Sequence, residues 1–236
     1  MEKEALERIF DFLEEKGEHK VPLRWKFINN QPLTKEELIV DDDLDLSYTD
    51  ITSLPEGLKV YGDLHLDMTK FLKSLPEGLE VGGDLELNSS SIKSLPKGLN
   101  VRGNLYLSNS NITSLPEGLE VGGDLDLIES DIEFLPKGLE VGGDLDLRYT
   151  NIKSLPEGLK VRGDLVIAIT PITSLPEGLK VGGSLFLDYL DINLLPEGLE
   201  VGGSLFIENT PLEKYTDEEL REMVKPGFVL GRIKRI

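Results

Sequence analysis

A 20-residue unit recurs almost unchanged through most of this chain, and it limits the possible fold more than any other feature. One copy runs from Val141 to Lys160, and the string Leu-Pro-Glu/Lys-Gly-Leu occurs eight times between Leu54 and Leu199. A fixed period of this length is typical of a solenoid, in which each coil buries its apolar edge against its neighbours. Constant positions are then used for stacking, so we look for function among the positions that change.

Apolar and polar residues alternate with a period of two in each unit, as in the segment that holds Val81, Gly83, Leu85 and Leu87. This alternation predicts one strand with a buried face, and stacked copies predict a parallel sheet with about 4.8 Å per coil. At the glycine we expect that a side chain would strike the facing Leu-Pro segment. The Leu-Pro-Glu-Gly-Leu return limb is too short for an α-helix and predicts an irregular or 3₁₀ convex side, closed by a left-handed glycine.

A hydroxyl residue follows the predicted strand in eight coils, and such a side chain can bond backbone groups that a turn leaves unpaired. Leu190 replaces the hydroxyl in one coil, where we expect irregularity. An extra residue near Phe71-Leu72 predicts a bulge in the second coil. The hydroxyl residues are Thr49, Thr69, Ser90, Ser110, Ser130, Thr150, Thr170 and Thr210.

The pattern Leu-x-Leu-x-x-Thr/Ser-x-Ile-x-x-Leu-Pro-x-x-Leu resembles the leucine-rich repeat over about 170 residues. It is most similar to the short bacterial class with Leu-Pro-x-x-Leu, as in secreted Yersinia and Shigella effectors. Two departures are the hydroxyl in place of the usual asparagine and the Val-x-Gly-x that precedes Leu-x-Leu. This variant looks like 20-residue repeat proteins of bacteria and their phages. The resemblance implies a leucine-rich-repeat solenoid that binds a protein.

We expect three parts: a helical cap over residues 1–42, a repeat array of about nine coils over 43–211, and a C-terminal cap over 212–236. Residues 3–15 have apolar residues at helical spacing, and Thr34 to Glu37 has the capping-box pattern of a second helix. Thr216 begins a further predicted helix, which ends at Pro226-Gly227. Residues 228–236 then predict a strand or hairpin that closes the last coil.

The net charge of −19 is concentrated in the array, because residues 41–210 hold 30 acidic and 12 basic residues. Such a surface repels nucleic acid and anionic membranes and attracts a basic partner, although solubility alone also explains it. The basic-aromatic tetrapeptide Arg24–Phe27 is too short to predict nucleic-acid binding. For the basic tail Arg232–Arg235, protection of the last strand edge is the favoured role.

The chain has no cysteine, which excludes disulfides, thiolate metal sites and a cysteine nucleophile. Its first residues lack the apolar segment of a Sec-type signal, and no stretch reaches the roughly 18 apolar residues that a membrane span needs. We therefore expect a cytoplasmic protein that contacts no membrane. Export by a route without a Sec signal stays open.

The outward positions of the predicted strands are mostly acidic in the first coils and apolar in the last ones. We expect the apolar residues to anchor a protein partner, and the acidic residues to steer a basic region of that partner towards them. The predicted partner-binding residues are Tyr106, Tyr149, Val166, Ile169, Phe186, Tyr189 and Phe206. The predicted acidic steering residues are Asp84, Glu86, Asp124, Asp126, Asp144 and Asp146.

Other uses of these residues stay open at this point. The C-terminal segment or a second copy in a homodimer could cover the apolar residues. The acidic rod could mimic DNA and inhibit a nucleic-acid-binding protein, or the solenoid could be structural or self-associating. Stacked carboxylates could hold Ca²⁺ or hydrolyse a glycoside, but the repeat itself imposes their spacing. We therefore predict no metal, no cofactor and no enzyme, but a protein-binding module with a bacterial or phage effector or inhibitor as one role.

Overall fold

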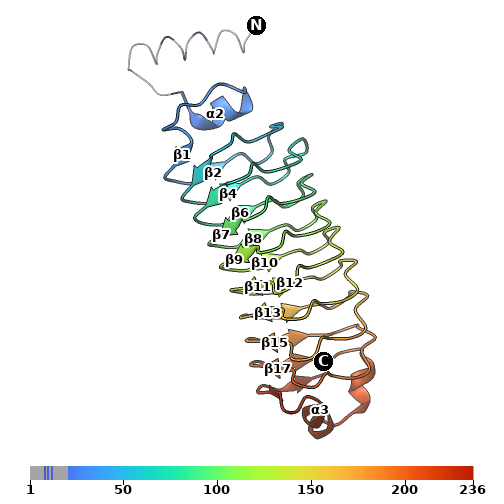
Figure 1. Ribbon diagram of the computed structural model, residues 1–236. Helices are drawn as coiled ribbons and strands as arrows, with labels where there is room; N and C mark the ends of the chain where they lie inside the picture. Colours follow the sequence, from blue (N-terminus) through green and yellow to red (C-terminus); the bar gives the residue numbers. More distant parts are fainter. Residues whose placement is uncertain (1–7, 9, 11, 13–20, 236) are drawn as a thin grey trace.

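The computed structural model describes residues 8, 10, 12 and 21–235, and their coils stack into a long rod (Figure 1). Each coil contributes one two-residue strand to each of two parallel sheets, and both sheets have ten strands. Successive coils pair at an offset of 20 residues, as Leu125 does with Leu145, or of 21 residues across the longer second coil. The predicted solenoid is therefore confirmed.

The two sheets are named by their order along each coil. The first sheet contains β1 (Ile39–Val40), β3 (Lys59–Val60), β5 (Glu80–Val81), β7 (Asn100–Val101), β9 (Glu120–Val121), β11 (Glu140–Val141), β13 (Lys160–Val161), β15 (Lys180–Val181), β17 (Glu200–Val201) and β19 (Phe228–Val229). The second sheet contains β2 (Leu44–Asp45), β4 (Leu64–His65), β6 (Leu85–Glu86), β8 (Leu105–Tyr106), β10 (Leu125–Asp126), β12 (Leu145–Asp146), β14 (Leu165–Val166), β16 (Leu185–Phe186), β18 (Leu205–Phe206) and β20 (Ile233–Lys234).

The single strand predicted for each coil is wrong, because a bend divides it in two. In the third coil β5 ends at Val81, residues 82–84 bend, and β6 begins at Leu85. Val81, Leu85 and Leu87 are buried as the alternation predicted. Residues 82–84 are all half-buried, but the buried residues on the two sides of the bend keep the same two-residue phase, and for that reason the sequence pattern did not reveal the bend.

The residue at the end of each bend joins its coil to the next one. Asp124 Oδ1 accepts a hydrogen bond from the backbone N–H of Asp144 at 2.7 Å, and Asp144 Oδ1 accepts one from Asp164 at 2.6 Å. A backbone N–H at a bend lacks a strand partner, and the neighbouring carboxylate supplies a strong acceptor. We call this series the aspartate ladder: Asp43, Asp63, Asp84, Asn104, Asp124, Asp144, Asp164, Ser184 and Ser204.

The aspartate ladder also explains the inward glycine of each coil. A Cβ added to Gly143 would lie 2.0 Å from Asp124 Oδ1 and 2.9 Å from the backbone of Gly123. The expected clash with the Leu-Pro segment is therefore wrong, since the obstacle is the preceding coil. The glycine of the return limb does close its turn in the left-handed region, with a φ of 77° at Gly158.

The turn hydroxyls bond within their own coil, as predicted. Thr150 Oγ1 donates to the Leu147 carbonyl at 2.7 Å, and Thr49, Thr69, Ser110, Ser130, Thr170 and Thr210 make the same bond. Ser90 Oγ has no partner within the described residues. The irregularity expected at Leu190 is wrong, because Leu190 is buried and its coil keeps the same turn.

The bulge expected in the second coil is confirmed. Bends at Lys70 and Phe71 hold the extra residue, so that Leu72 is fully buried while Phe71 is exposed. The return limbs contain turns rather than helices, as predicted for a thin convex side. Leucine, valine and isoleucine side chains of all coils form one continuous core from Phe27 to Ile233.

The caps differ in part from the prediction. The helix predicted over residues 3–15 lies outside the described residues, except for Arg8, Phe10 and Phe12. Thr34 and Glu37 exchange the hydrogen bonds of a capping box, but a turn follows instead of the predicted helix. The described helices are α2 (Leu23–Ile28), the 3₁₀ helix η1 (Pro211–Lys214) and α3 (Asp217–Met223), and the last starts at the predicted capping box of Thr216.

The C-terminal segment forms neither a single strand nor a hairpin. Its strands β19 and β20 each pair in parallel with the preceding coil, Val229 with Val201 and Ile233 with Leu205. The segment thus adds a tenth rung to both sheets. This arrangement pairs the backbone groups at the edge of the ninth coil in parallel, so that the strands keep one direction.

An arginine from each cap bonds free carbonyls at the end of the rod. Arg24 of α2 donates to the carbonyls of Asp45 and Ser47, and Arg221 of α3 donates to those of Val229 and Gly231. Alternate residues of a parallel strand bond opposite neighbours, so an end strand retains unpaired carbonyls. The two guanidiniums protect these edges from pairing with another chain.

Removing one rung of the aspartate ladder should weaken the rod. We expect Asp124→Ala to lower the free energy of unfolding by about 1 kcal/mol, because the N–H of Asp144 loses its acceptor. Asp124→Asn keeps an acceptor and removes one of a row of like charges, so its stability should equal or exceed that of the native chain. Urea unfolding of both variants measures this, and equal losses would contradict a hydrogen-bonding role.

Candidate functional site

One column of outward side chains runs along the second sheet, with one residue from each strand. The register pairs Asp126 with Asp146, Asp146 with Val166, Val166 with Phe186, and Phe186 with Phe206. Tyr106 precedes Asp126 in the same column. Four of the seven predicted partner-binding residues therefore lie in one line, and all four are half-buried.

The C-terminal end of this column is aromatic. The rings of Phe186 and Phe206 stack with centroids 4.1 Å apart and an interplanar angle of 14°. Lys234 Nζ lies 4.5 Å from the centroid of Phe206, because Lys234 is paired with Phe206 in the next strand. Within the described residues, the C-terminal segment thus extends the column and does not fold across it.

A second row of apolar residues lies in the turn just after the strands of the second sheet. Tyr149, Ile169 and Tyr189 are 53, 42 and 55% exposed, and they come from three successive coils. We define the apolar face as this row together with the end of the column: Tyr149, Val166, Ile169, Phe186, Tyr189 and Phe206.

The residues of this second row have left-handed backbone conformations, with φ of 60° at Tyr149, 59° at Ile169 and 63° at Tyr189. Bulky and β-branched residues are unfavourable there, whereas asparagine tolerates the region and occupies it at Asn109 and Asn209. The chain therefore keeps exposed apolar side chains at positions where its own backbone favours a polar residue. Because every coil has this conformation, including those with Ser89 and Glu129, the apolar side chain and not the conformation distinguishes these three positions.

Sequence reasoning missed two members of this row. Tyr48 and Met68 have the same left-handed conformation in the first two coils and are 78 and 41% exposed. Each stands directly before the turn hydroxyl, as Tyr149 and Ile169 do. An alignment of the coils on that hydroxyl places them in the same column as Asn109 and Asn209. Asparagine in this column is the sequence signal of a left-handed conformation.

The predicted acidic steering residues are mostly engaged in internal bonds. Asp84, Asp124 and Asp144 belong to the aspartate ladder. The other three are held by side chains or by their own turns: Glu86 pairs with His65 at 2.7 Å, Asp126 accepts from the N–H of Ile128, and Asp146 pairs with Arg148 at 2.6 Å. Their charges stay at the surface, so electrostatic steering remains a prediction beside this structural role.

The contacts around His65 set its protonation. Burial acts to lower the pKa of His65, but the hydrogen bond to Glu86 and the charges of Glu86, Asp45 and Asp63 outweigh it, so that the pKa is raised. The pKa of Asp67, which lies in the same coil, is raised mainly by burial. The imidazolium is thus stabilised by the acidic surface around it.

Within the described part of the chain, only Asp43, Asp63 and His65 group their potential metal ligands within 4.8 Å of one another. Oδ1 of both aspartates already accepts a backbone N–H, and His65 Nδ1 faces Glu86. Each of the three side chains is thus already bonded within the protein, and we assign no metal to the group. None of the described helices has the length and apolar character that crossing a membrane requires.

Comparisons with known proteins find distant similarity to solved structures. No family model and no curated protein matches the chain. Among solved structures, a Shigella effector LRR domain matches with 19% identity and a TM-score of 0.45, over 97% of this chain and 96% of that one. The fold class follows from the 20-residue, leucine-lined coils and their parallel pairing. The chain is a leucine-rich-repeat-type solenoid.

The strain in the second row of this leucine-rich-repeat solenoid can be measured directly. We expect Ile169→Asn to raise the free energy of unfolding by about 1 kcal/mol, because asparagine tolerates the left-handed region. Val166→Asn, in the adjacent strand, is the control and should lower stability. Urea unfolding compares them, and a loss of stability for Ile169→Asn would show that its side chain serves packing.

The charge of His65 should make the solenoid more stable at mildly acid pH. Its raised folded-state pKa means that its contribution is fully present below about pH 6.5 and is lost as the pH rises through the folded pKa. We expect Glu86→Gln to lower the pKa of His65 and reduce this dependence. NMR titration of the imidazole, with unfolding at pH 6 and 8, tests it; an unchanged pKa would contradict the pairing.

Proposed function

We propose that this solenoid is a non-enzymatic protein-binding module that holds one protein partner on its apolar face. The observation that carries the proposal is the row Tyr149, Ile169 and Tyr189, exposed and apolar at positions where the backbone favours asparagine. Contiguous exposed apolar residues on a soluble rod indicate an interaction surface, and aromatic side chains dominate binding energy at such surfaces.

The two rows of the apolar face make a compact contact area. Val166, Phe186 and Phe206 occupy consecutive strands, and the second row lies beside them in the turns that follow. With roughly 4.8 Å between coils, the face extends over about 15–20 Å along the rod. The stacked rings of Phe186 and Phe206 need no reordering on binding, which reduces the entropic cost of association.

The charge of the array supports a partner with a basic region. The column beside the apolar face carries Asp126 and Asp146, and the net charge of the chain is −19. Such a field accelerates encounter with a basic surface, while the apolar contacts keep the complex together. We propose a bacterial or phage effector or inhibitor acting on a host protein, as the repeat pattern implies.

Asparagine substitutions make the sharpest test, because they remove apolar side chains and relieve strain together. Native protein and the Tyr149→Asn/Ile169→Asn/Tyr189→Asn variant serve as baits in a bacterial lysate, with bound proteins identified by mass spectrometry. We expect the variant to stay folded and lose the partner that the native chain retains. The control Tyr48→Asn/Met68→Asn makes the same change at the other end of the rod and should keep that partner.

The other outcomes separate the remaining functions. A partner that both variants retain, and that high salt releases, would favour a DNA mimic acting through the acidic surface. Concentration-dependent sedimentation that only the triple variant abolishes would assign the apolar face to a homodimer. A partner kept by the triple variant but lost with Phe186→Ser/Phe206→Ser would move the contact to the aromatic column.

A further inference from the structure

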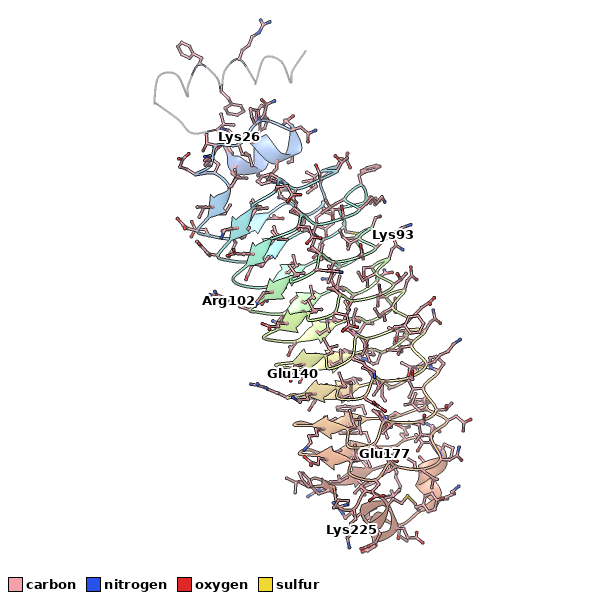
Figure 2. All side chains as sticks on the ribbon, viewed as in Figure 1. Lys26, Lys93, Arg102, Glu140, Glu177 and Lys225 are labelled. Atoms are coloured by element: carbon pink, nitrogen blue, oxygen red, sulfur yellow. The ribbon has the colours of Figure 1, made fainter. Side chains whose placement is uncertain are left out.

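The first sheet carries a hollow of about 630 Å³ that contains none of the residues of the apolar face. Its lining spans four coils, from Asn100 to Arg162. Figure 2 shows Arg102 and Glu140 on the edge of the rod opposite to Lys93 and Glu177, which belong to the return limbs. The hollow therefore offers a second, separate surface.

Glycine forms the floor of this hollow because the stack requires it. A Cβ added to Gly142 would lie 2.0 Å from the carbonyl oxygen of Gly122, and one added to Gly122 would lie 2.1 Å from that of Arg102. Gly82, Gly182 and Gly202 have the same close contact in their coils. A side chain at these glycines would therefore require a local shift of the backbone.

Arginine nevertheless occupies this position at both ends of the hollow. The backbone N–H of Arg102 lies 3.5 Å from the carbonyl oxygen of Val81, and that of Arg162 lies 3.1 Å from the oxygen of Val141. The corresponding distances at the five glycines are between 2.8 and 3.0 Å. Tyr61 and Leu230 occupy the same position with distances of 2.8 and 2.9 Å, so the stack tolerates a side chain there. The two arginines are therefore distinguished by their charge, which they place at both ends of a glycine floor.

In the part of the chain that the structure describes, neither guanidinium has a hydrogen-bond partner, although the chain is strongly acidic. Within the described residues, the side chains of Arg102 and Arg162 donate no hydrogen bond and enter no ion pair, whereas those of Arg24, Arg148 and Arg235 do both. The other described arginine with side-chain bonds, Arg221, bonds two carbonyls of the edge strand. Two unpaired guanidiniums therefore face one hollow.

The acidic residues between the two arginines already have partners. Glu140 accepts from Lys160 Nζ at 2.5 Å, and Glu120 accepts from Asn100 Nδ2 at 3.1 Å. The hydrogen bond and charge of Lys160 lower the pKa of Glu140, and the charge of Arg162 adds to the effect. A ligand with dense negative charge would still be repelled by these two carboxylates. A ligand with a single anionic group at each end keeps its charges away from these two carboxylates.

We propose that the hollow binds an extended acidic peptide of a partner protein, with one carboxylate held by Arg102 and another by Arg162. The arginines are three coils apart, which corresponds to roughly 14 Å, or about four residues of extended chain. Arginine binds a carboxylate through two parallel hydrogen bonds. Small residues between the two carboxylates would lie on Gly122 and Gly142, where the floor has no side chains.

The chain supplies its own matched variant for the test. Arg102→Gly/Arg162→Gly restores the residue that the stack prefers, so its midpoint of urea unfolding should equal or exceed the native one. Lys93→Gln/Lys153→Gln, on the exposed return limbs, removes the same charge elsewhere and is the control. The probe is the peptide Gly-Glu-Ala-Ser-Ala-Glu-Gly with both termini blocked. Its binding is measured by NMR from the backbone amide signals of Gly122 and Gly142.

We expect saturable shifts of these two amides with the native chain and the lysine control. The dissociation constant should rise by about tenfold or more in the arginine variant, or when both peptide glutamates are replaced by glutamine. A peptide with glutamates two residues apart should bind less well. The proposal is overturned if the shifts are absent, if the arginine variant binds equally, if it unfolds at lower urea, or if a phosphoserine peptide binds more tightly than the glutamate one.

The experiment is independent of the apolar face. Binding of the peptide by the Tyr149→Asn/Ile169→Asn/Tyr189→Asn variant should match that of the native chain. If the lysate experiment yields no partner, the peptide site is not contradicted. If the peptide does not bind, the proposed function of the apolar face is not contradicted.

Discussion

The hydrogen bond from each bend to the carboxylate of the preceding coil is the interaction on which the rest of the rod depends. A coil of 20 residues must bend between its two sheets, and a bend leaves a backbone N–H that no strand can satisfy. Asp124 and its equivalents accept that N–H, and the inward glycines leave room for them. The acidic character of the array is thus partly a consequence of its stacking.

Strict stacking makes the exceptions informative. Most coils obey the same rules at every position, so a residue that breaks a rule without improving the packing points to another use. Ile169 occupies a left-handed position that suits asparagine, and Arg102 occupies one that suits glycine. Two groups of exceptions form surfaces, the apolar face beside the second sheet and the arginine-lined hollow on the first. Under the two proposals, the rod binds two different segments of a partner.

The ends of the rod follow from the same backbone requirement. Each coil contacts only its neighbours, so the first and last strands would expose unpaired carbonyls along both sheets. Arg24 and Arg221 bond these carbonyls from helices of the caps, and Arg235 ties the tail to Asp217. Two of these cap arginines therefore protect strand edges, and the third holds the C-terminal tail.

The sequence by itself determined the solenoid, its core, the turn hydroxyls and the column from Tyr106 to Phe206, because period and alternation report burial directly. Only the tertiary structure revealed the bend, since the buried residues on its two sides keep the same two-residue phase. Contacts between coils likewise decided the roles of Asp124 and Gly143, whose partners lie 20 residues away in the chain. The left-handed φ of Ile169 and the free guanidinium of Arg102 also depend on the folded backbone, because local sequence contains neither.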